Sequence, residues 1–306
     1  MRNSLLIIAL LATSCAAAMN LTSDACAQGK EANKSMLVST AWLAEHLGDR
    51  SLVVLQTGNR ASYDAGHIPG ARLIEMSMIS ASGPLTLELP PVDKLKSAFE
   101  ELGVSDNSRI VICFSGNSVT SATRTFFTLD YMGLSKQTSL LDGGLEAWKA
   151  ESRSVTTEAP VVARGNITLH PRQELVVDAA WVSANLKNPK VAIVDARDPQ
   201  FYTGANAGRM PRAGHIPTAV NITFSRLADA SNKFQDSATL AKIFNDAGVA
   251  QGKQVVSYCH IGLQASLVYF VAKYLGYDAR LYDGSFEDWS KRNDLPVEAP
   301  AAKTAK

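Results

Sequence analysis

Cysteine is scarce in this chain, with four among 306 residues, and only Cys113 and Cys259 lie beyond the first 30 positions. So few cysteines exclude a disulfide-rich scaffold. The five histidines show no spacing with cysteine that is typical of zinc sites, so we expect no metal. The net charge is only +1, because 30 Lys and Arg nearly balance 29 Asp and Glu, and nothing indicates binding to nucleic acid or to an anionic membrane.

Long hydrophobic runs are also absent. The apolar run at residues 5–12 follows a cationic start at Arg2 and is too short to span a bilayer, which is typical of a secretory signal. Cleavage after Ala27 fits the small residues at Ala25 and Ala27, so we expect a signal peptide over residues 1–27 and an exported, periplasmic protein. Cys15 lies in a sequence that loosely resembles a lipoprotein box, which leaves a lipid anchor as the alternative.

The chain contains an internal repeat. Residues 66–69 and 214–217 both read Gly-His-Ile-Pro, and residues 141–148 (LDGGLEAW) correspond to residues 282–289 (YDGSFEDW). Both pairs are separated by nearly the same length of chain, as two copies of one domain would be. The sequence therefore predicts domains at residues 36–150 and 173–295, a linker at 151–172 and a disordered tail at 296–306.

Each half alternates short apolar strands with amphipathic helices. This pattern predicts an α/β fold in which each domain has a mostly parallel sheet flanked by helices on both faces. The expected strands include residues 52–55, 109–112, 191–194 and 254–258, and the expected helices include 92–102, 179–186, 238–247 and 263–274.

Cys259 ends an apolar strand and is followed by a glycine-bearing turn and then a helix. The unpaired N–H groups of a helix amino terminus favour a thiolate over a thiol. Gly262 allows a positive φ, so that successive amides can point at the sulfur. A buried structural cysteine is the alternative. The pattern favours a nucleophilic Cys259 in an anion-binding loop made of His260, Ile261, Gly262, Leu263 and Gln264.

The two copies differ at this cysteine. In register, the first copy has Phe114 where the second has Cys259, while Cys113 corresponds to Tyr258. The loop after Phe114 is also about two residues longer before the next matching glycine. We therefore expect the first domain to be inactive and Cys113 to be a strand residue.

Two charged residues also differ between the two copies. Asp195 and Arg197 end the strand expected at 191–194, and the first copy has neither charge. Arg197 is a candidate for binding an anionic substrate, because its guanidinium offers a fixed charge and paired donors. Asp195 either supports that site or only pairs with Arg197. His67 and His215 occur in both copies, so we expect them to hold turns.

These motifs resemble the tandem-domain rhodaneses, or thiosulfate sulfurtransferases. The resemblance is carried by both Gly-His-Ile-Pro turns, the Val-Asp-Ala-Arg strand end at 194–197, the loop at 259–264 and both Asp-Gly-x-x-x-x-Trp segments. It covers nearly all of the mature chain. It implies an inactive first domain, a Cys259 persulfide, a substrate-binding Arg197 and transfer of sulfane sulfur from thiosulfate, a small anionic donor, to cyanide or a thiol, which are thiophilic acceptors. That chemistry requires no metal or organic cofactor.

The loop departs from the family pattern. Thiosulfate-using relatives often carry Arg or Lys after the cysteine, and mercaptopyruvate-using relatives carry small neutral residues and a Thr, whereas residues 260–264 match neither set. We therefore keep 3-mercaptopyruvate as an alternative donor. The missing positive charge could be supplied by residues outside the loop, namely Arg197, Arg209, Arg212 and Lys253, and His260 could add charge below neutral pH.

Two other classes of protein remain. A non-enzymatic persulfide carrier that serves a partner protein would need the same cysteine. A cysteine phosphatase or arsenate reductase would need an arginine six positions after the cysteine, where this chain has Ala265.

Overall fold

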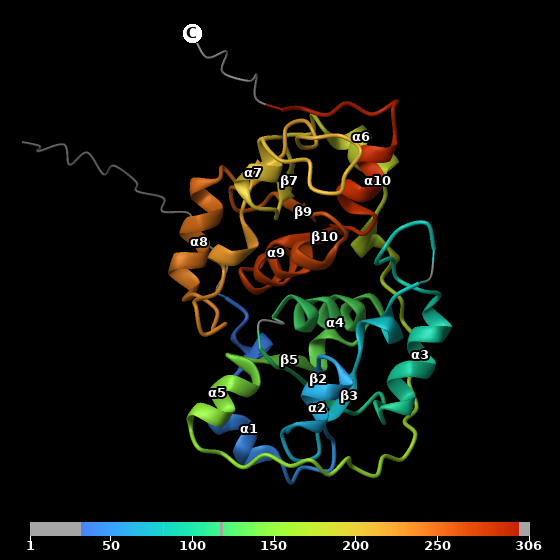
Figure 1. Ribbon diagram of the computed structural model, residues 1–306, viewed down its shortest axis with the longest axis vertical. Helices are drawn as coiled ribbons and strands as arrows, with labels where there is room; N and C mark the ends of the chain where they lie inside the picture. Colours follow the sequence, from blue (N-terminus) through green and yellow to red (C-terminus); the bar gives the residue numbers. More distant parts are fainter. Residues whose placement is uncertain (1–31, 82, 117–118, 300–306) are drawn as a thin grey trace, which may run out of the picture.

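The computed structural model describes residues 32–81, 83–116 and 119–299, which form two α/β domains (Figure 1). The expected signal peptide, with Cys15 and Cys26, lies outside the described residues. Within the described part of the chain, no helix combines the length and apolar character needed to cross a membrane.

Each domain is built on a five-stranded sheet, and every pair of neighbouring strands in both sheets is parallel. In the first sheet the order is β1 (Leu37–Val38), β5 (Thr138–Leu141), β4 (Arg109–Phe114), β2 (Leu52–Thr57) and β3 (Arg72–Ile74). In the second it is β6 (Val176–Val177), β10 (Asp278–Tyr282), β9 (Gln254–Tyr258), β7 (Val191–Asp195) and β8 (Val220–Asn221). The identical strand order confirms that the chain repeats one fold.

Helices cover both faces of each sheet. The first domain contains α1 (Thr40–His46), α2 (Arg60–Asp64), α3 (Val92–Glu101), α4 (Val119–Tyr131) and α5 (Gly144–Ala150), and the second contains α6 (Ala179–Asn185), α7 (Pro199–Tyr202), α8 (Ser237–Asp246), α9 (Leu263–Tyr274) and α10 (Ser285–Lys291). Short 3-10 turns are η1 (Lys34–Met36), η2 (Met76–Ile79), η3 (Ser135–Gln137), η4 (Gln173–Leu175) and η5 (Phe224–Arg226). Side chains alternate along β2, so Val53 and Leu55 join one core cluster and Val54 joins another.

Strand register places Phe114 and Cys259 at equivalent positions. Gln56 of β2 pairs with Cys113 of β4, and Asp195 of β7 pairs with Tyr258 of β9. Phe114 directly follows Cys113 in the first domain, and Cys259 directly follows Tyr258 in the second. The register inferred from the repeat is therefore confirmed.

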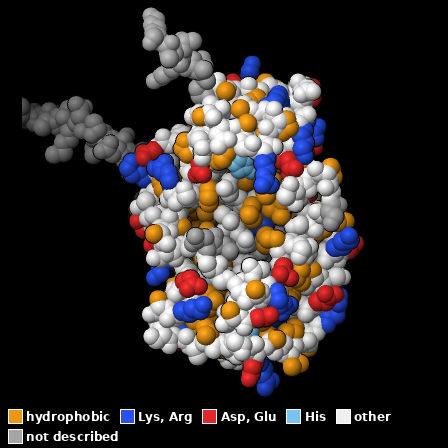
Figure 2. All heavy atoms as spheres, in the orientation of Figure 1, with side chains coloured by type: hydrophobic (Ala, Val, Ile, Leu, Met, Phe, Trp, Pro, Cys, Tyr) orange, Lys and Arg blue, Asp and Glu red, His pale blue; other side chains and the backbone are white. Residues whose placement is uncertain are grey.

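The two domains meet along α4 and α9, which lie side by side between the two sheets (Figure 1). The rings of Phe126 and Phe270 contact edge to face with centroids 4.9 Å apart, and those of Phe127 and Tyr269 do so at 5.0 Å. One cluster of buried apolar side chains runs through both domains. In the same orientation, hydrophobic side chains gather in the middle of the molecule, where the domains meet (Figure 2).

The segment expected to be a linker packs against the first domain. Ile167 is buried, the Gly165 N–H donates to the Glu100 carbonyl at 2.7 Å, and Thr156 forms a two-residue antiparallel bridge with His67. His67 also stacks on Tyr63, as His215 does on Tyr202, so both histidines hold turns.

Part of the expected disordered tail is ordered, which corrects that expectation for residues 296–299. Glu298 bridges His215 as Thr156 bridges His67, and Trp289 donates through Nε1 to the Pro296 carbonyl at 2.8 Å. The repeat explains this order, because in each domain the chain that follows the last helix runs back and pairs with the histidine turn. Residues 300–306 lie outside the described residues.

Candidate active site

Cys259 lies between the end of β9 and the start of α9 and is completely buried. Gly262 precedes the helix with a φ of 85°, a conformation that favours glycine. The resulting turn brings the backbone N–H groups of Ile261, Gly262, Gln264 and Ala265 close enough to the sulfur to lower the pKa of its thiol. This arrangement, which we call the cradle, is an anion-binding loop at a helix amino terminus.

Two effects on the Cys259 thiol oppose each other. Burial raises its pKa and is the larger effect, while the four cradle N–H groups lower it, and the net pKa lies above the ordinary value of 9.0. Burial thus opposes the thiolate that the turn pattern predicts. The cradle offsets only part of the cost of removing a charged sulfur from water.

The backbone of Cys259 is tied to the start of α10. Its N–H donates to Ser285 Oγ at 3.2 Å, its carbonyl accepts from the Phe286 N–H at 3.0 Å, and the His260 carbonyl accepts from the Glu287 N–H at 2.9 Å. Sequence reasoning missed Ser285. The repeat contained a signal for it, because the first copy has Gly144 at that position.

Asp195 and Arg197 form a buried ion pair beside the cysteine. Arg197 donates through Nε and Nη2 to the two carboxylate oxygens at 3.0 and 2.6 Å, and Nη2 also donates to the Gly214 carbonyl at 2.7 Å. Burial lowers the pKa of Arg197, but its hydrogen bond to Asp195 and the charge of Asp195 raise it, and the net shift is upward. Arg197 is thus a permanently charged side chain held by Asp195 and packed over the ring of Phe286.

A cavity of about 500 Å³ adjoins the cradle, with His260 and Ile261 in its wall. Most of the other lining is apolar, including Phe201 and Met210. Arg209 also lines it and makes no hydrogen bond or ion pair with any residue that the structure describes. Cys259 itself is buried, whereas His260 and Ile261, the two residues that follow it, line the cavity.

His260 adds no charge to this cavity at neutral pH. Burial lowers its pKa below 6.5, and the nearby charge of Arg197 lowers it further. Two of the other cations considered from the sequence are also unavailable. Arg212 binds four backbone carbonyls around the end of α10, and Lys253 precedes β9, at the opposite end of that strand from Cys259.

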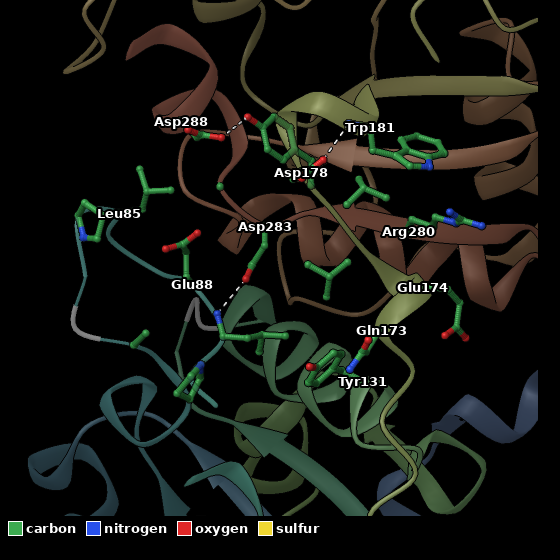
Figure 3. Close-up of a pocket in the computed structure, with 18 of the residues that line it drawn as sticks. Leu85, Glu88, Tyr131, Gln173, Glu174, Asp178, Trp181, Arg280, Asp283 and Asp288 are labelled. Atoms are coloured by element: carbon green, nitrogen blue, oxygen red, sulfur yellow. Dashed lines mark hydrogen bonds between the residues drawn. The ribbon is translucent and has the colours of Figure 1, made fainter. Parts of the chain in front are cut away.

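A larger cavity of about 930 Å³ lies at the domain boundary, between the first-domain loop at 83–90 and the strands β6 and β10 (Figure 3). Its polar side chains are largely engaged: Asp283 accepts from the Leu89 N–H at 2.8 Å, and Tyr282 donates to Asp288 at 2.7 Å. The cradle residues do not line it. Within residues 32–81, 83–116 and 119–299, no group of three His, Cys, Asp or Glu is placed to hold a metal.

Comparison with known proteins agrees with the repeated fold. A family model described as a rhodanese-like domain matches residues 39–151 and 178–292. The chain belongs to the rhodanese-like family. Rhodanese-like domains therefore occupy both halves of the chain, and the first has Phe114 at the position where the second has Cys259.

Curated relatives extend over most of the chain. The identity is 32% over 281 residues to the sulfur carrier protein TtuD of Thermus thermophilus and 31% over 269 residues to the thiosulfate sulfurtransferase of Azotobacter vinelandii. It is 29% over 275 residues to the 3-mercaptopyruvate sulfurtransferase of Escherichia coli. These alignments cover 87%, 87% and 85% of this chain and 97%, 98% and 97% of the relatives.

The same rhodanese-like arrangement occurs among solved structures. The anaerobic ergothioneine biosynthesis enzyme from Chlorobium limicola superposes with a TM-score of 0.78 at 21% identity, over 86% of this chain and 70% of that enzyme. At this identity the likeness shows the fold alone.

Proposed function

We propose that this protein is a sulfurtransferase that moves sulfane sulfur from thiosulfate to cyanide or a thiol through a persulfide on Cys259. The cradle is the observation that carries the proposal. Four fixed N–H dipoles around a sulfur atom suit a persulfide, whose terminal sulfur carries the negative charge. The curated names of the relatives, which include two kinds of sulfurtransferase, support the same chemistry.

The proposed reaction has two steps. In the first, the Cys259 thiolate attacks the outer sulfur of thiosulfate, a new S–S bond forms, the S–S bond of the donor breaks, and sulfite leaves with the electron pair. In the second, the acceptor attacks the terminal sulfur of the persulfide, and Cys259 leaves as the thiolate. Cyanide becomes thiocyanate. We expect ping-pong kinetics, because the first product leaves before the acceptor reacts.

Thiosulfate is our proposed donor, and 3-mercaptopyruvate is the alternative. Both donors are anions, and the unpaired Arg209 in the cavity wall is placed to attract either one. The relatives include enzymes named for each donor. Arg197 is held in position by its ion pair with Asp195 and contributes positive charge to the site.

The test is the intact mass of the mature protein after incubation with thiosulfate, followed by a cyanide chase. We expect one added sulfur atom on the wild-type protein, none on Cys259→Ser, and release of the sulfur as thiocyanate. A gain only with 3-mercaptopyruvate would reassign the donor. Loading of Cys259→Ser to the wild-type level would contradict the assignment of Cys259 as sulfur acceptor.

A persulfide carrier is the second candidate, because one relative is named a sulfur carrier protein. The same cradle would hold the sulfur in either case. Turnover decides between the two: a sulfurtransferase forms many equivalents of thiocyanate from thiosulfate and cyanide with no partner protein, whereas a carrier stops after one.

We propose that the protein is exported to the periplasm after loss of residues 1–27. The apolar run at residues 5–12 and the small residues before position 28 support this proposal. The amino terminus of the secreted form tests it. A mature chain beginning at Gln28 is expected, whereas a lipid-modified amino terminus at Cys15 would show an anchored protein.

A further inference from the structure

Two consecutive side chains of the first domain reach the cradle of the second. Arg124 and Thr123 lie on α4, at the face that packs against α9, and both are completely buried. Neither residue lines the cavity beside the cradle. Each makes contacts on a different side of the turn that holds Cys259.

Arg124 supports the side of the cradle at Gly262. Its Nη1 donates to Asp283 Oδ1 at 2.6 Å, and its Nη2 donates to the Leu87 carbonyl at 2.9 Å. Asp283 also accepts the Leu89 N–H, a contact visible in Figure 3. A Cβ atom on Gly262 would lie 3.0 Å from the Asp283 carbonyl and 3.1 Å from Arg124 Nη1. The ion pair thus packs directly against the backbone of a cradle residue.

Thr123 supports the other side of the cradle. Its Oγ1 shares a hydrogen bond of 2.8 Å with Ser266 Oγ, and Ser266 Oγ donates to the Leu263 carbonyl at 2.6 Å. Leu263 follows Gly262 and begins α9. Adjacent residues of one helix therefore restrain both Gly262 and Leu263.

The hydrogen bonding of Arg124 is unusual for a buried side chain whose only role is to stabilise the fold. Its Nε is buried and has no hydrogen-bond partner among the described residues. A buried ion pair with incomplete hydrogen bonding gains little over an apolar packing of the same size. Retaining a cation at this place is better explained by its effect on the turn beside it.

We infer that Arg124 is a positioning residue for sulfur transfer, supplied by the domain that lacks the cysteine. Its ion pair with Asp283, aided by the Thr123–Ser266 contact, holds the cradle N–H groups in the arrangement that receives the sulfur. The role in transfer rests on the proposed function. The role in ordering the cradle does not, and it can be measured without any sulfur donor.

Amide hydrogen exchange of the full chain tests the ordering role. In Arg124→Met, we expect peptides covering residues 260–266 to exchange at least about tenfold faster than in the wild type, as loss of local protection permits. The control is Arg172→Met. Arg172 pairs at 2.7 Å with Asp130, which lies on α4 as Arg124 does but away from the cradle. Residues 260–266 should therefore keep their wild-type exchange in this variant. Unchanged exchange of these residues in Arg124→Met would overturn the inference, whether or not the protein transfers sulfur.

Steady-state kinetics test the role in transfer. Because Arg124 does not line the donor cavity, kcat with thiosulfate or 3-mercaptopyruvate should fall about tenfold or more while KM stays within about twofold. Arg124→Lys, which retains the charge, should recover part of kcat. A fall in kcat equal to that of Arg172→Met would overturn the role in transfer.

Loss of Arg124 alone leaves Asp283 buried without its cation, which destabilises the folded protein. The double variant R124M/D283N removes both charges and should restore folding. Low kcat and fast exchange at 260–266 in this folded variant are the expected result. Wild-type values for both would show that the pair only balances charge.

Discussion

Cys259 shows at the scale of a single residue how burial and hydrogen bonding compete. The four cradle N–H groups favour a negative sulfur, but removal from water has the larger effect and raises the pKa of the thiol. The neighbouring Arg197 stays charged and His260 stays neutral at physiological pH. The pH dependence of the first step should therefore follow the thiol.

We predict that the second-order rate of sulfur loading rises with pH through neutrality. A thiol whose pKa lies above 9.0 is mostly protonated at pH 6–8, so its thiolate fraction grows about tenfold per pH unit. Rapid-mix loading with thiosulfate, followed by intact mass at each pH, measures the profile. A plateau beginning below pH 7 would show instead that the cradle outweighs burial.

Gly262 is the residue at which backbone conformation and packing coincide. We predict that Gly262→Ala costs about 1–3 kcal/mol of the free energy of unfolding, because its φ is 85°, and that it also lowers sulfur loading. Gly252→Ala is the matched control. Gly252 has a φ of 86° but open space around its Cα and lies before β9, so it should lose similar stability with wild-type loading. Chemical denaturation and intact mass provide the two measurements.

The turn that follows the central strand distinguishes the two domains at the scale of the element. After β9 the turn carries Cys259 and leaves room for Ser285, whose hydroxyl accepts the Cys259 N–H. In the first domain Phe114, the last residue of β4, takes the equivalent place, and a Cβ atom on Gly144 would lie only 2.5 Å from the Phe114 carbonyl. The first-domain turn therefore has no room for a side chain at Gly144, whereas the second-domain turn holds Ser285 at the equivalent position.

We predict that a cysteine at position 114 does not create a second sulfur site. The double variant Phe114→Cys with Cys259→Ser should gain no sulfur from thiosulfate by intact mass. The adjacent Cys113 should not load either, because burial raises its thiol pKa far above the usual range. Loading of the double variant would show that the longer loop of the first domain can still form a cradle.

One cluster of buried apolar side chains is shared by both domains of the molecule. The paired rings of α4 and α9 belong to the cluster that runs through both sheets. The buried Asp130 of α4 also accepts from Tyr269 at 2.6 Å and pairs with Lys273, both on α9. Such a boundary resembles a domain interior more than a contact between independently moving parts.

We therefore predict a single cooperative unfolding transition in calorimetry. Phe270→Ala should lower the stability by about 3–5 kcal/mol, because it opens a cavity where the domains meet. Hydrogen exchange should show protection falling together in β4 and β9. A loss confined to β9 would mean that the two domains unfold independently.

Much of this architecture could be predicted from the sequence, because its signals are local. Strands such as 254–258 and helices such as 263–274 follow from hydrophobic period and turn residues, and their bounds agree with the structure. Comparing the chain with itself located the strand end that carries Cys259 and the substitution at Phe114. The inference worked because both copies must satisfy the same packing, so differences between them stand out.

The tertiary structure decided what depends on distance across the fold. Burial by surrounding elements raises the pKa of the Cys259 thiol, an effect that the turn pattern alone does not indicate. Residues 296–299 are ordered through a contact with His215 that composition does not indicate. The approach of Arg124 to Gly262 joins residues far apart in the chain through packing of α4 on α9, and no local period or motif encodes that proximity.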